Sequence, residues 1–186
     1  LKKGKTIDEQ RELVRNEGCK IADSLNALDC KSLAIVDLSG ADMALVFAEG
    51  VELANYRFNK YLSEKKKVSL VEVNVCGDVC EKEIASLNSL VKGVFIARDI
   101  VNEPLSYMTA KKLAETIEEV GKSCGFKTEI LDKKQIESLK MGGLLAVNRG
   151  SVEPPTFSIL KWEPENAINE HPYILVGKGL VFDTGG

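Results

Sequence analysis

Histidine and tryptophan are almost missing from this sequence, which contains one residue of each among 186. Because His171 is the only histidine, a metal site built from several histidines is excluded. A Ser-His-Asp catalytic triad would depend on that one side chain. The composition therefore gives little support to histidine-based chemistry.

Cysteine is present, but it forms no regular framework. The chain has five cysteines, so at least one stays unpaired: Cys19, Cys30, Cys76, Cys80 and Cys124. Cys76 and Cys80 do not have the spacing of a zinc ribbon, and no second close pair follows them. This pattern predicts scattered, reduced thiols, as in a cytosolic protein.

An excess of positive charge and long apolar runs are also lacking. Lysine and arginine number 25 against 28 acidic residues, so no basic field exists to attract nucleic acid or an anionic membrane. The apolar runs are strand-sized and no secretory signal is visible. With 44% hydrophobic residues, the composition favours a globular protein of one large or two small domains, without membrane or nucleic-acid partners.

The first half of the chain alternates helical and strand patterns. We expect helices over residues 6–28 and 41–62, and strands over residues 31–38 and 67–75. In the second helix, the residues expected to face inward are Val46, Leu53 and Phe58. Helix, strand, helix and strand in this order predict an α/β fold.

A long helix follows over residues 82–101 and must stop before Pro104, because proline disfavours a helical residue before it. A domain boundary is expected here. The predicted organisation is a domain over residues 1–81, a linking helix over 82–103 and a second domain over 104–186. Both domains are expected to be incomplete, with truncation at both ends of the chain.

The second domain has its own helix and strand signals. Thr109 and Gly125 are the expected cap and stop of a helix. Asp132 followed by Gln135 predicts the start of a short helix that ends near residue 141. Strands are predicted over residues 126–131, 156–162 and 173–179. The last is almost wholly apolar and is therefore predicted to be central in its sheet.

The chain ends on VGKGLVFDTGG, residues 176–186, which places Lys178 and Asp183 among four glycines. In a regular strand these two side chains face opposite sides, so one shared site requires a bend, which glycine permits. The position follows a buried strand, where open α/β sheets bind ligands. A solvated ion pair is the simpler alternative. A phosphate loop of the Walker type is excluded, because Gly179 stands where serine or threonine is needed.

Four ordered segments carry a specific resemblance to the leucyl aminopeptidase family, the M17 cytosol aminopeptidases. They are residues 48–62, residues 97–115 with ARDIVNEP, residues 141–157 with MGGLLAVNRGS, and the terminal VGKGLVFDTGG. The resemblance implies the end of a macro-like amino-terminal α/β domain and a linking helix. It also implies the start of an α/β catalytic domain with a central mixed sheet.

The resemblance further implies that Lys178 and Asp183 are ligands of two divalent metal ions, with Asp183 bridging both. Zinc or manganese is expected, with magnesium as a third candidate. A lysine ligand must bind as the neutral amine, which burial and nearby cations favour. The remaining ligands, the catalytic residues and a bicarbonate-binding arginine are expected downstream of Gly186, with no catalytic residue within this chain. The chain alone is therefore predicted to be inactive.

The implied activity is two-metal hydrolysis that releases amino-terminal residues, leucine preferentially, from peptides with a free amino terminus. The implied whole protein is a cytoplasmic homo-hexamer. Two alternatives stay open: an ATP-dependent, sugar-kinase-like phosphotransferase, suggested by FDTGG, and a non-catalytic binding fragment. Asn102, Glu103 and Pro104 are interpreted as structural, and Arg98 and Asp99 as an interdomain ion pair.

Overall fold

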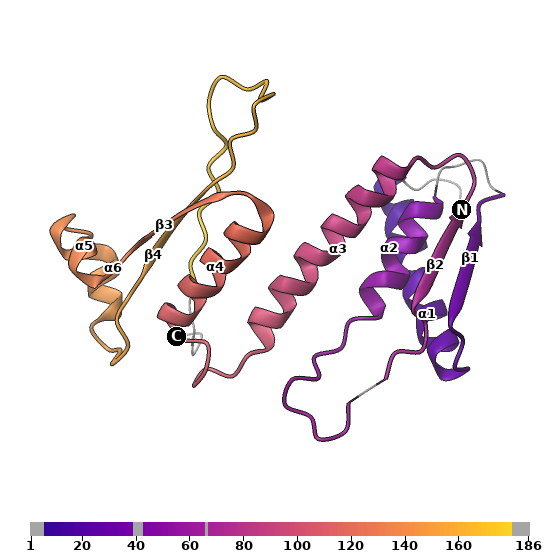
Figure 1. Cartoon of the computed structure of the whole chain (residues 1–186), viewed down its shortest axis with the longest axis horizontal. Helices are drawn as coiled ribbons and strands as arrows, with labels where there is room; N and C mark the ends of the chain where they lie inside the picture. The colour runs from indigo at the N-terminus through magenta and orange to yellow at the C-terminus, as the bar shows by residue number, and fades with distance from the viewer. Residues whose placement is uncertain (1–5, 39–42, 66, 180–186) are drawn as a thin grey trace. The chain divides into compact units, whose positions relative to one another are not determined.

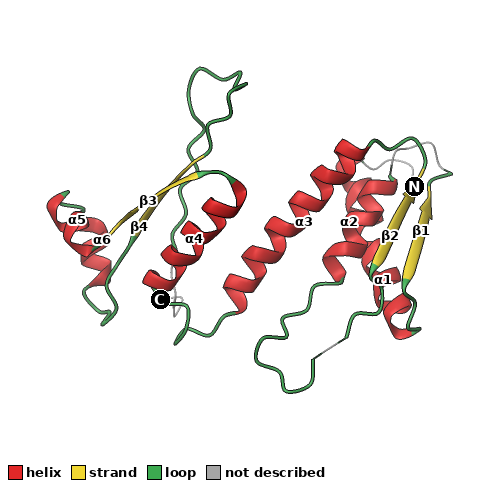
Figure 2. Ribbon diagram, viewed as in Figure 1, coloured by secondary structure: helices red, strands yellow, loops and turns green. Residues whose placement is uncertain are grey.

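The structure of the chain is a computed structural model that describes residues 6–38, 43–65 and 67–179 (Figures 1 and 2). The chain divides into two compact units, Leu1–Asn102 and Glu103–Gly186. The units are described separately below. Among the described residues, no helix combines the length and the apolar character needed to cross a bilayer.

The first unit is an α/β unit with a small parallel sheet. Its elements are α1 (Ile7–Ala27), β1 (Ser32–Val36), α2 (Ala44–Ala54), β2 (Glu72–Cys76) and α3 (Glu81–Asn102). Strands β1 and β2 pair in parallel, with Ser32 opposite Glu72 and Val36 opposite Cys76. Parallel neighbours need a crossover connection, which here contains α2. The α/β class expected from the sequence is confirmed.

Helices α1 and α2 cross so closely that backbone meets backbone. A side-chain carbon added to Gly18 would clash with the carbonyl oxygen of Phe47, and one added to Gly50 would clash with that of Arg15. The thiol of Cys19 donates a hydrogen bond to the carbonyl oxygen of Gly50, at 3.1 Å. Glycine is therefore needed at the crossing because it has no side chain.

The core of the first unit lies where α1, α2 and the segment before β2 meet. Ala22, Val51 and Leu70 are buried there. Partly buried Leu33 of β1 and Val73 of β2 pack against them. One face of the two-stranded sheet therefore rests on the helix pair, since alternate residues of a strand point to the same side.

Asn26, near the end of α1, connects three segments by hydrogen bonds. Its side-chain oxygen accepts from the backbone N–H groups of Ser69 at 2.8 Å and Leu70 at 3.1 Å. Its side-chain nitrogen donates to the Asn55 side chain at 2.8 Å. The Asn55 amide nitrogen in turn donates to the carbonyl oxygen of Leu70, at 3.2 Å.

This network explains two differences from the sequence predictions. Helix α2 ends at Ala54 rather than near residue 62, since Asn55 is its C-cap and its side chain is bound to Asn26 and Leu70. Strand β2 starts at Glu72 rather than near residue 67, since the preceding backbone bonds to Asn26 and to Lys31 instead of continuing the sheet.

The predicted inward face of α2 is also wrong. Ala44, Ala48 and Val51 are buried, whereas Val46 and Leu53 are only partly buried. Phe58 lies beyond the end of the helix, and its ring packs against that of Tyr61 with 5.8 Å between centroids. Because α1 lies so close, only small residues of α2 fit between the two helices. The spacing of apolar residues in the sequence does not reveal which face of α2 meets α1.

The end of α3 is held to the residue that follows the C-cap of α2. The Tyr56 hydroxyl donates to Asp99 at 2.8 Å, and the Arg98 guanidinium lies 4.2 Å from the centre of the Tyr56 ring. Arg98 also donates to the carbonyl oxygen of Leu53, at 2.9 Å. The described contacts of Arg98 and Asp99 therefore lie within the first unit, and their interpretation as an interdomain ion pair stays a prediction.

The second unit contains one long helix and several short elements. Its elements are α4 (Ala110–Cys124), β3 (Lys127–Leu131), α5 (Lys133–Ser138), α6 (Gly142–Asn148) and β4 (Phe157–Lys161). Strands β3 and β4 are antiparallel, with Lys127 opposite Lys161 and Leu131 opposite Phe157. Helix α6 was not predicted from the sequence, and no side chain caps its first turn.

The predicted ends of α4 and the predicted start of α5 are confirmed, whereas α5 ends at Ser138 rather than near residue 141. The Thr109 hydroxyl accepts from the N–H of Lys112, and Gly125 ends α4 in the left-handed region with φ of 80°. Asp132 and Gln135 form a reciprocal capping box at the start of α5. Such end signals are local, so sequence alone can reveal them.

Candidate functional site

The segment that leads to the terminal motif is exposed. Residues 173–179 form no strand in the described structure, so the predicted central strand is wrong for these residues. The side chains of Tyr173, Ile174, Leu175 and Val176 are 80–97% exposed. A strand requires neighbouring backbone for its hydrogen bonds, and the described sheet of this unit contains only β3 and β4.

Lys178 is the one predicted metal ligand that the structure describes. It is exposed, so the burial that favours a neutral amine ligand is absent around it in the described structure. Asp183 lies outside the described residues. Among the described residues, no three histidine, cysteine, aspartate or glutamate side chains come together as a metal site. The assignment of Lys178 and Asp183 as ligands therefore stays a prediction.

Gly179 lies close to α4. A side-chain carbon added to it would sit 3.4 Å from a terminal carbon of Leu113, whereas the same addition at Gly177 would meet open space. Of the two glycines that flank Lys178, Gly179 therefore lies against α4, whereas Gly177 has open space around it.

The segment with MGGLLAVNRGS has a structural role in the loop before β4. The Asn148 side chain donates to the carbonyl oxygen of Glu153 at 3.0 Å, and the Ser151 hydroxyl accepts from the Glu153 N–H at 3.1 Å. The Thr156 hydroxyl donates to the carbonyl oxygen of Ala110 at 3.2 Å, which joins the approach to β4 to the start of α4.

The Asn102–Pro104 junction is also built from local hydrogen bonds. The Asn102 side chain donates to the Tyr56 hydroxyl at 3.1 Å and to the carbonyl oxygen of Arg98 at 2.8 Å. The carbonyl oxygen of Pro104 accepts from the N–H groups of Tyr107 and Met108, each at 2.9 Å. For Asn102 and Pro104, these contacts agree with the structural interpretation.

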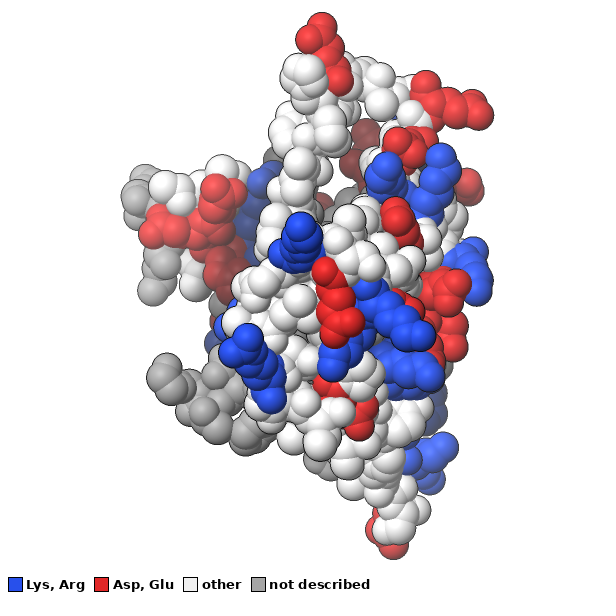
Figure 3. Space-filling model, turned by 90° about the vertical axis from the view of Figure 1, so that its left-hand side faces the viewer, with Lys and Arg blue, Asp and Glu red and all other residues white. Residues whose placement is uncertain are grey.

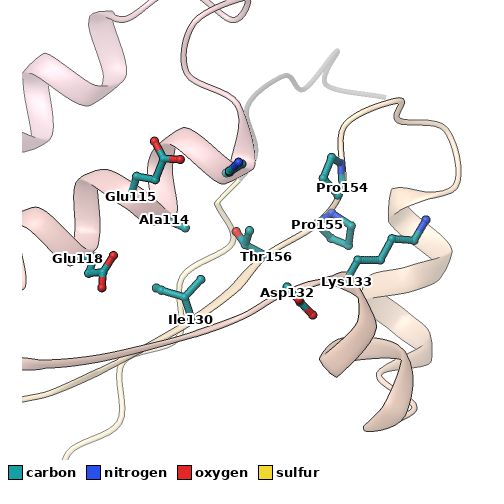
Figure 4. Close-up of a pocket in the computed structure, with 10 residues that line it drawn as sticks. Ala114, Glu115, Glu118, Ile130, Asp132, Lys133, Pro154, Pro155 and Thr156 are labelled. Carbon is teal, nitrogen blue, oxygen red and sulfur yellow. The ribbon is translucent and has the colours of Figure 1, made fainter.

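A shallow pocket of about 260 Å³ lies between α4 and the strands of the second unit (Figure 4). Its lining includes Ala114, Ile130 and Pro155, with Glu118 and Lys133 among the charged lining residues. None of the predicted metal ligands lines it. No pattern in the sequence indicates this pocket, because α4, β3 and the loop before β4 meet only in the folded unit.

Charges of both signs are interspersed on the face drawn in Figure 3. Ion pairs of the second unit join Lys122 to Glu118 at 3.3 Å and Lys127 to Glu163 at 3.1 Å. The hydrogen bond from Lys127 lowers the pKa of Glu163 below its usual value. These exposed pairs contribute little to stability.

Known proteins show what these segments belong to. The family described as "Cytosol aminopeptidase family, catalytic domain" matches residues 95–186. A protein of Clostridium perfringens named "Probable cytosol aminopeptidase" is 33% identical over 196 residues, which cover 98% of this chain and 40% of that protein. A protein of the same name from Chlorobium limicola is 35% identical, covering 98% of this chain and 43% of its own length.

Solved structures agree with these relatives. A mutant of tomato leucine aminopeptidase has a TM-score of 0.72 and 26% identity, covering 79% of this chain and 32% of its own length. The bottromycin maturation enzyme BotP in complex with manganese has a TM-score of 0.69 and 29% identity, covering 82% of this chain and 34% of its own length.

The fold and the matched segments relate this chain to proteins named as aminopeptidases. More narrowly, the chain belongs to the cytosol aminopeptidase family. It spans about 40% of the length of the first curated relatives, 40% and 43% in the two cases above.

Proposed function

We propose that this chain is part of a metal-dependent aminopeptidase that hydrolyses the first peptide bond of peptides with a free amino terminus. A leucine-type preference and a cytoplasmic location belong to the same proposal. The observation that carries it is the VGKGLVFDTGG segment, which ends the region matched by the family's catalytic domain. The relatives' printed name, cytosol aminopeptidase, supports both the activity and the location.

The proposed metal centre uses Lys178 and Asp183 as two of its ligands. Their donor atoms, an amine nitrogen and carboxylate oxygens, suit zinc, manganese or magnesium. The manganese complex of BotP supports a divalent ion in this type of protein. Two side chains are too few to hold two ions, and the described residues supply no three-ligand group. Further ligands, and an arginine that holds a bicarbonate, are therefore proposed to belong to other residues of the full-length protein.

The metal ions, when bound, would supply Lewis-acid polarisation of the scissile carbonyl and an activated water. The contribution of this chain is more limited. Lys178 must lose its proton before its nitrogen can donate a lone pair, and glycines on both sides let the backbone approach closely. We also propose a homo-hexameric whole protein, on the basis of the family resemblance.

The decisive experiment measures leucine release from a leucyl peptide by the full-length protein that contains this chain. We expect Lys178→Ala and Asp183→Ala each to lower kcat/KM by at least about a hundredfold, because each removes a metal ligand. Bound metal, measured by elemental analysis, should fall in the same variants. Lys161→Ala is the matched control, since Lys161 is an exposed lysine on β4. Full turnover in both ligand variants would overturn the proposal.

The proposed inactivity of the chain by itself needs a separate measurement. The 186-residue chain, supplied with manganese or zinc, should release no leucine and should not bind two ions tightly in a calorimetric titration. An amino-terminally acetylated peptide serves as the substrate control, because it lacks the free amine. Turnover of the free peptide by this chain would show that the centre is complete within it.

A further inference from the structure

The connection between β2 and α3 carries two exposed thiols. Cys76 is the last residue of β2, and Cys80 directly precedes the first residue of α3. Both cysteines are exposed and unbonded to each other. Each of the other three cysteines is more than ten residues from its nearest neighbour of that type. The loop therefore holds the one close pair of cysteines in the sequence.

The loop between these cysteines is already turned. The N–H of Val79 donates to the carbonyl oxygen of Gly77 at 3.0 Å, and Gly77 has φ of 144°, which side chains disfavour. A side-chain carbon at Gly77 would meet nothing within 4 Å, so the turn has open space around it. A disulfide needs Cα atoms roughly 4.4–6.8 Å apart, and the turn at Gly77 folds the three-residue connection back so that its two ends are brought toward each other.

The backbone of Cys80 forms hydrogen bonds that fix its position, while its thiol stays exposed. The N–H of Cys80 donates to the Glu83 carboxylate at 3.0 Å, and its carbonyl oxygen accepts from the Glu83 and Ile84 N–H groups at 3.0 and 3.3 Å. By contrast, the Cys19 thiol donates to a backbone carbonyl and the Cys124 sulfur lies 3.6 Å from the Ser123 hydroxyl. No such contact occupies the thiols of Cys76 and Cys80 among the described residues.

A metal ion is the less favoured ligand for this pair. Two thiolates supply only half of a tetrahedral zinc site. The described residues contain no group of three metal-ligating side chains, so no carboxylate or further thiol completes one here. Redox chemistry needs only the two sulfurs.

We propose that Cys76 and Cys80 form a reversible dithiol–disulfide pair, oxidised by low-molecular-weight disulfides. One thiolate attacks the small disulfide, forms a mixed disulfide and releases the first small thiol. The second cysteine then attacks the mixed disulfide and releases the second small thiol. The two protons of the dithiol are transferred to the two released thiols, and a disulfide bond links the sulfurs of Cys76 and Cys80. In a reducing compartment such a bond is transient and reports oxidation.

The test uses the whole chain and glutathione disulfide as the probe. Trypsin cuts after Lys67 and Lys82, so the peptide of residues 68–82 contains both cysteines and no other. After reduction, this peptide should take two maleimide labels. After oxidation it should take none and be lighter by two hydrogen atoms than the dithiol peptide, and dithiothreitol should restore labelling. We expect its labelled fraction to fall at least about tenfold, whereas any Cys124 that loses its label should carry one glutathione, because it has no nearby cysteine in the sequence to displace it.

Single variants serve as matched controls. In Cys76→Ser and Cys80→Ser, the remaining thiol should end as a glutathione mixed disulfide, because no second thiol can displace it. The proposal is overturned if the oxidised wild-type peptide carries one or two glutathiones, or if it is linked to another cysteine peptide. Mass is measured here rather than peptide hydrolysis, so the result is independent of the proposed aminopeptidase activity.

Discussion

The two units of this chain are stabilised in different ways. In the first unit, α1 and α2 meet backbone to backbone at Gly18 and Gly50, and Asn26 joins three segments. In the second unit, the described sheet has only two strands and Ile136 is fully buried, while the apolar run before the terminal motif stays exposed. Close helix packing can complete a small core, whereas an isolated pair of strands leaves backbone and apolar side chains without cover.

The largest expected effect comes from the helix crossing. Gly50→Ala should lower the free energy of unfolding of the first unit by more than about 3 kcal/mol, because the added carbon clashes with rigid backbone. Circular dichroism during urea unfolding would measure this loss. Gly93→Ala on α3 is the matched control, since nothing lies within 4 Å of its added carbon. This control should be neutral or stabilising by up to about 1 kcal/mol.

A comparable stability for both glycine variants would show that the crossing tolerates a side chain. The only tryptophan, Trp162, lies in the second unit, so its fluorescence reports unfolding of that unit and not of the first. We expect its fluorescence transition to shift less in Gly50→Ala than the helical signal does.

Among the described residues of the second unit, Ile136 is the one large side chain that is fully buried. Ile136→Ala should cost about 2–4 kcal/mol, because it removes buried methyl groups and leaves a cavity. Amide hydrogen exchange of β3 and the Trp162 fluorescence transition would both report the loss. Leu139→Ala, three residues later and 61% exposed, should cost less than about 1 kcal/mol. Equal effects of the two substitutions would contradict a core centred on Ile136.

The smallest effect concerns a partly buried carboxyl of the first unit. Burial raises the pKa of Glu52 above 4.5, so the folded state binds this proton more tightly than the unfolded state does. Stability contributed by the group is therefore present at low pH and lost as pH rises through the folded pKa. Glu52→Gln should raise the free energy of unfolding at pH 7 by less than about 1 kcal/mol, and the gain should vanish near pH 4.

The control for this pH dependence is Glu64→Gln, which removes an exposed carboxyl of the same unit. Its free energy of unfolding at pH 7 should stay within about 0.5 kcal/mol of the wild-type value, as for most exposed substitutions. A gain in Glu52→Gln that grows toward acid pH would reverse the assigned sign.

The sequence predictions succeeded where the signal is local. Thr109, Gly125 and the Asp132–Gln135 capping box mark helix ends by hydrogen bonds within three or four residues. The end of α2 was missed because Asn55 is engaged by Asn26, a residue 29 positions away. The family resemblance was likewise visible in ordered segments, and the comparisons confirm it.

The candidate site was only partly predictable. Lys178 can be chosen from the motif, but its exposure follows from backbone that has no strand partner in the described sheet. Metal ligation needs several donors within a few ångströms, which sequence spacing does not specify.

The amino-acid order was enough to assign the family, the α/β class and those helix ends that are set by their own caps. The folded units were needed to show which small residues form the α1–α2 contact, where α2 stops, and that an apolar, strand-like run lies exposed. The two groups of features differ in the sequence separation of the residues that interact. Caps and turns are settled by bonds between near neighbours, whereas burial and strand pairing depend on which distant segment is available to meet them.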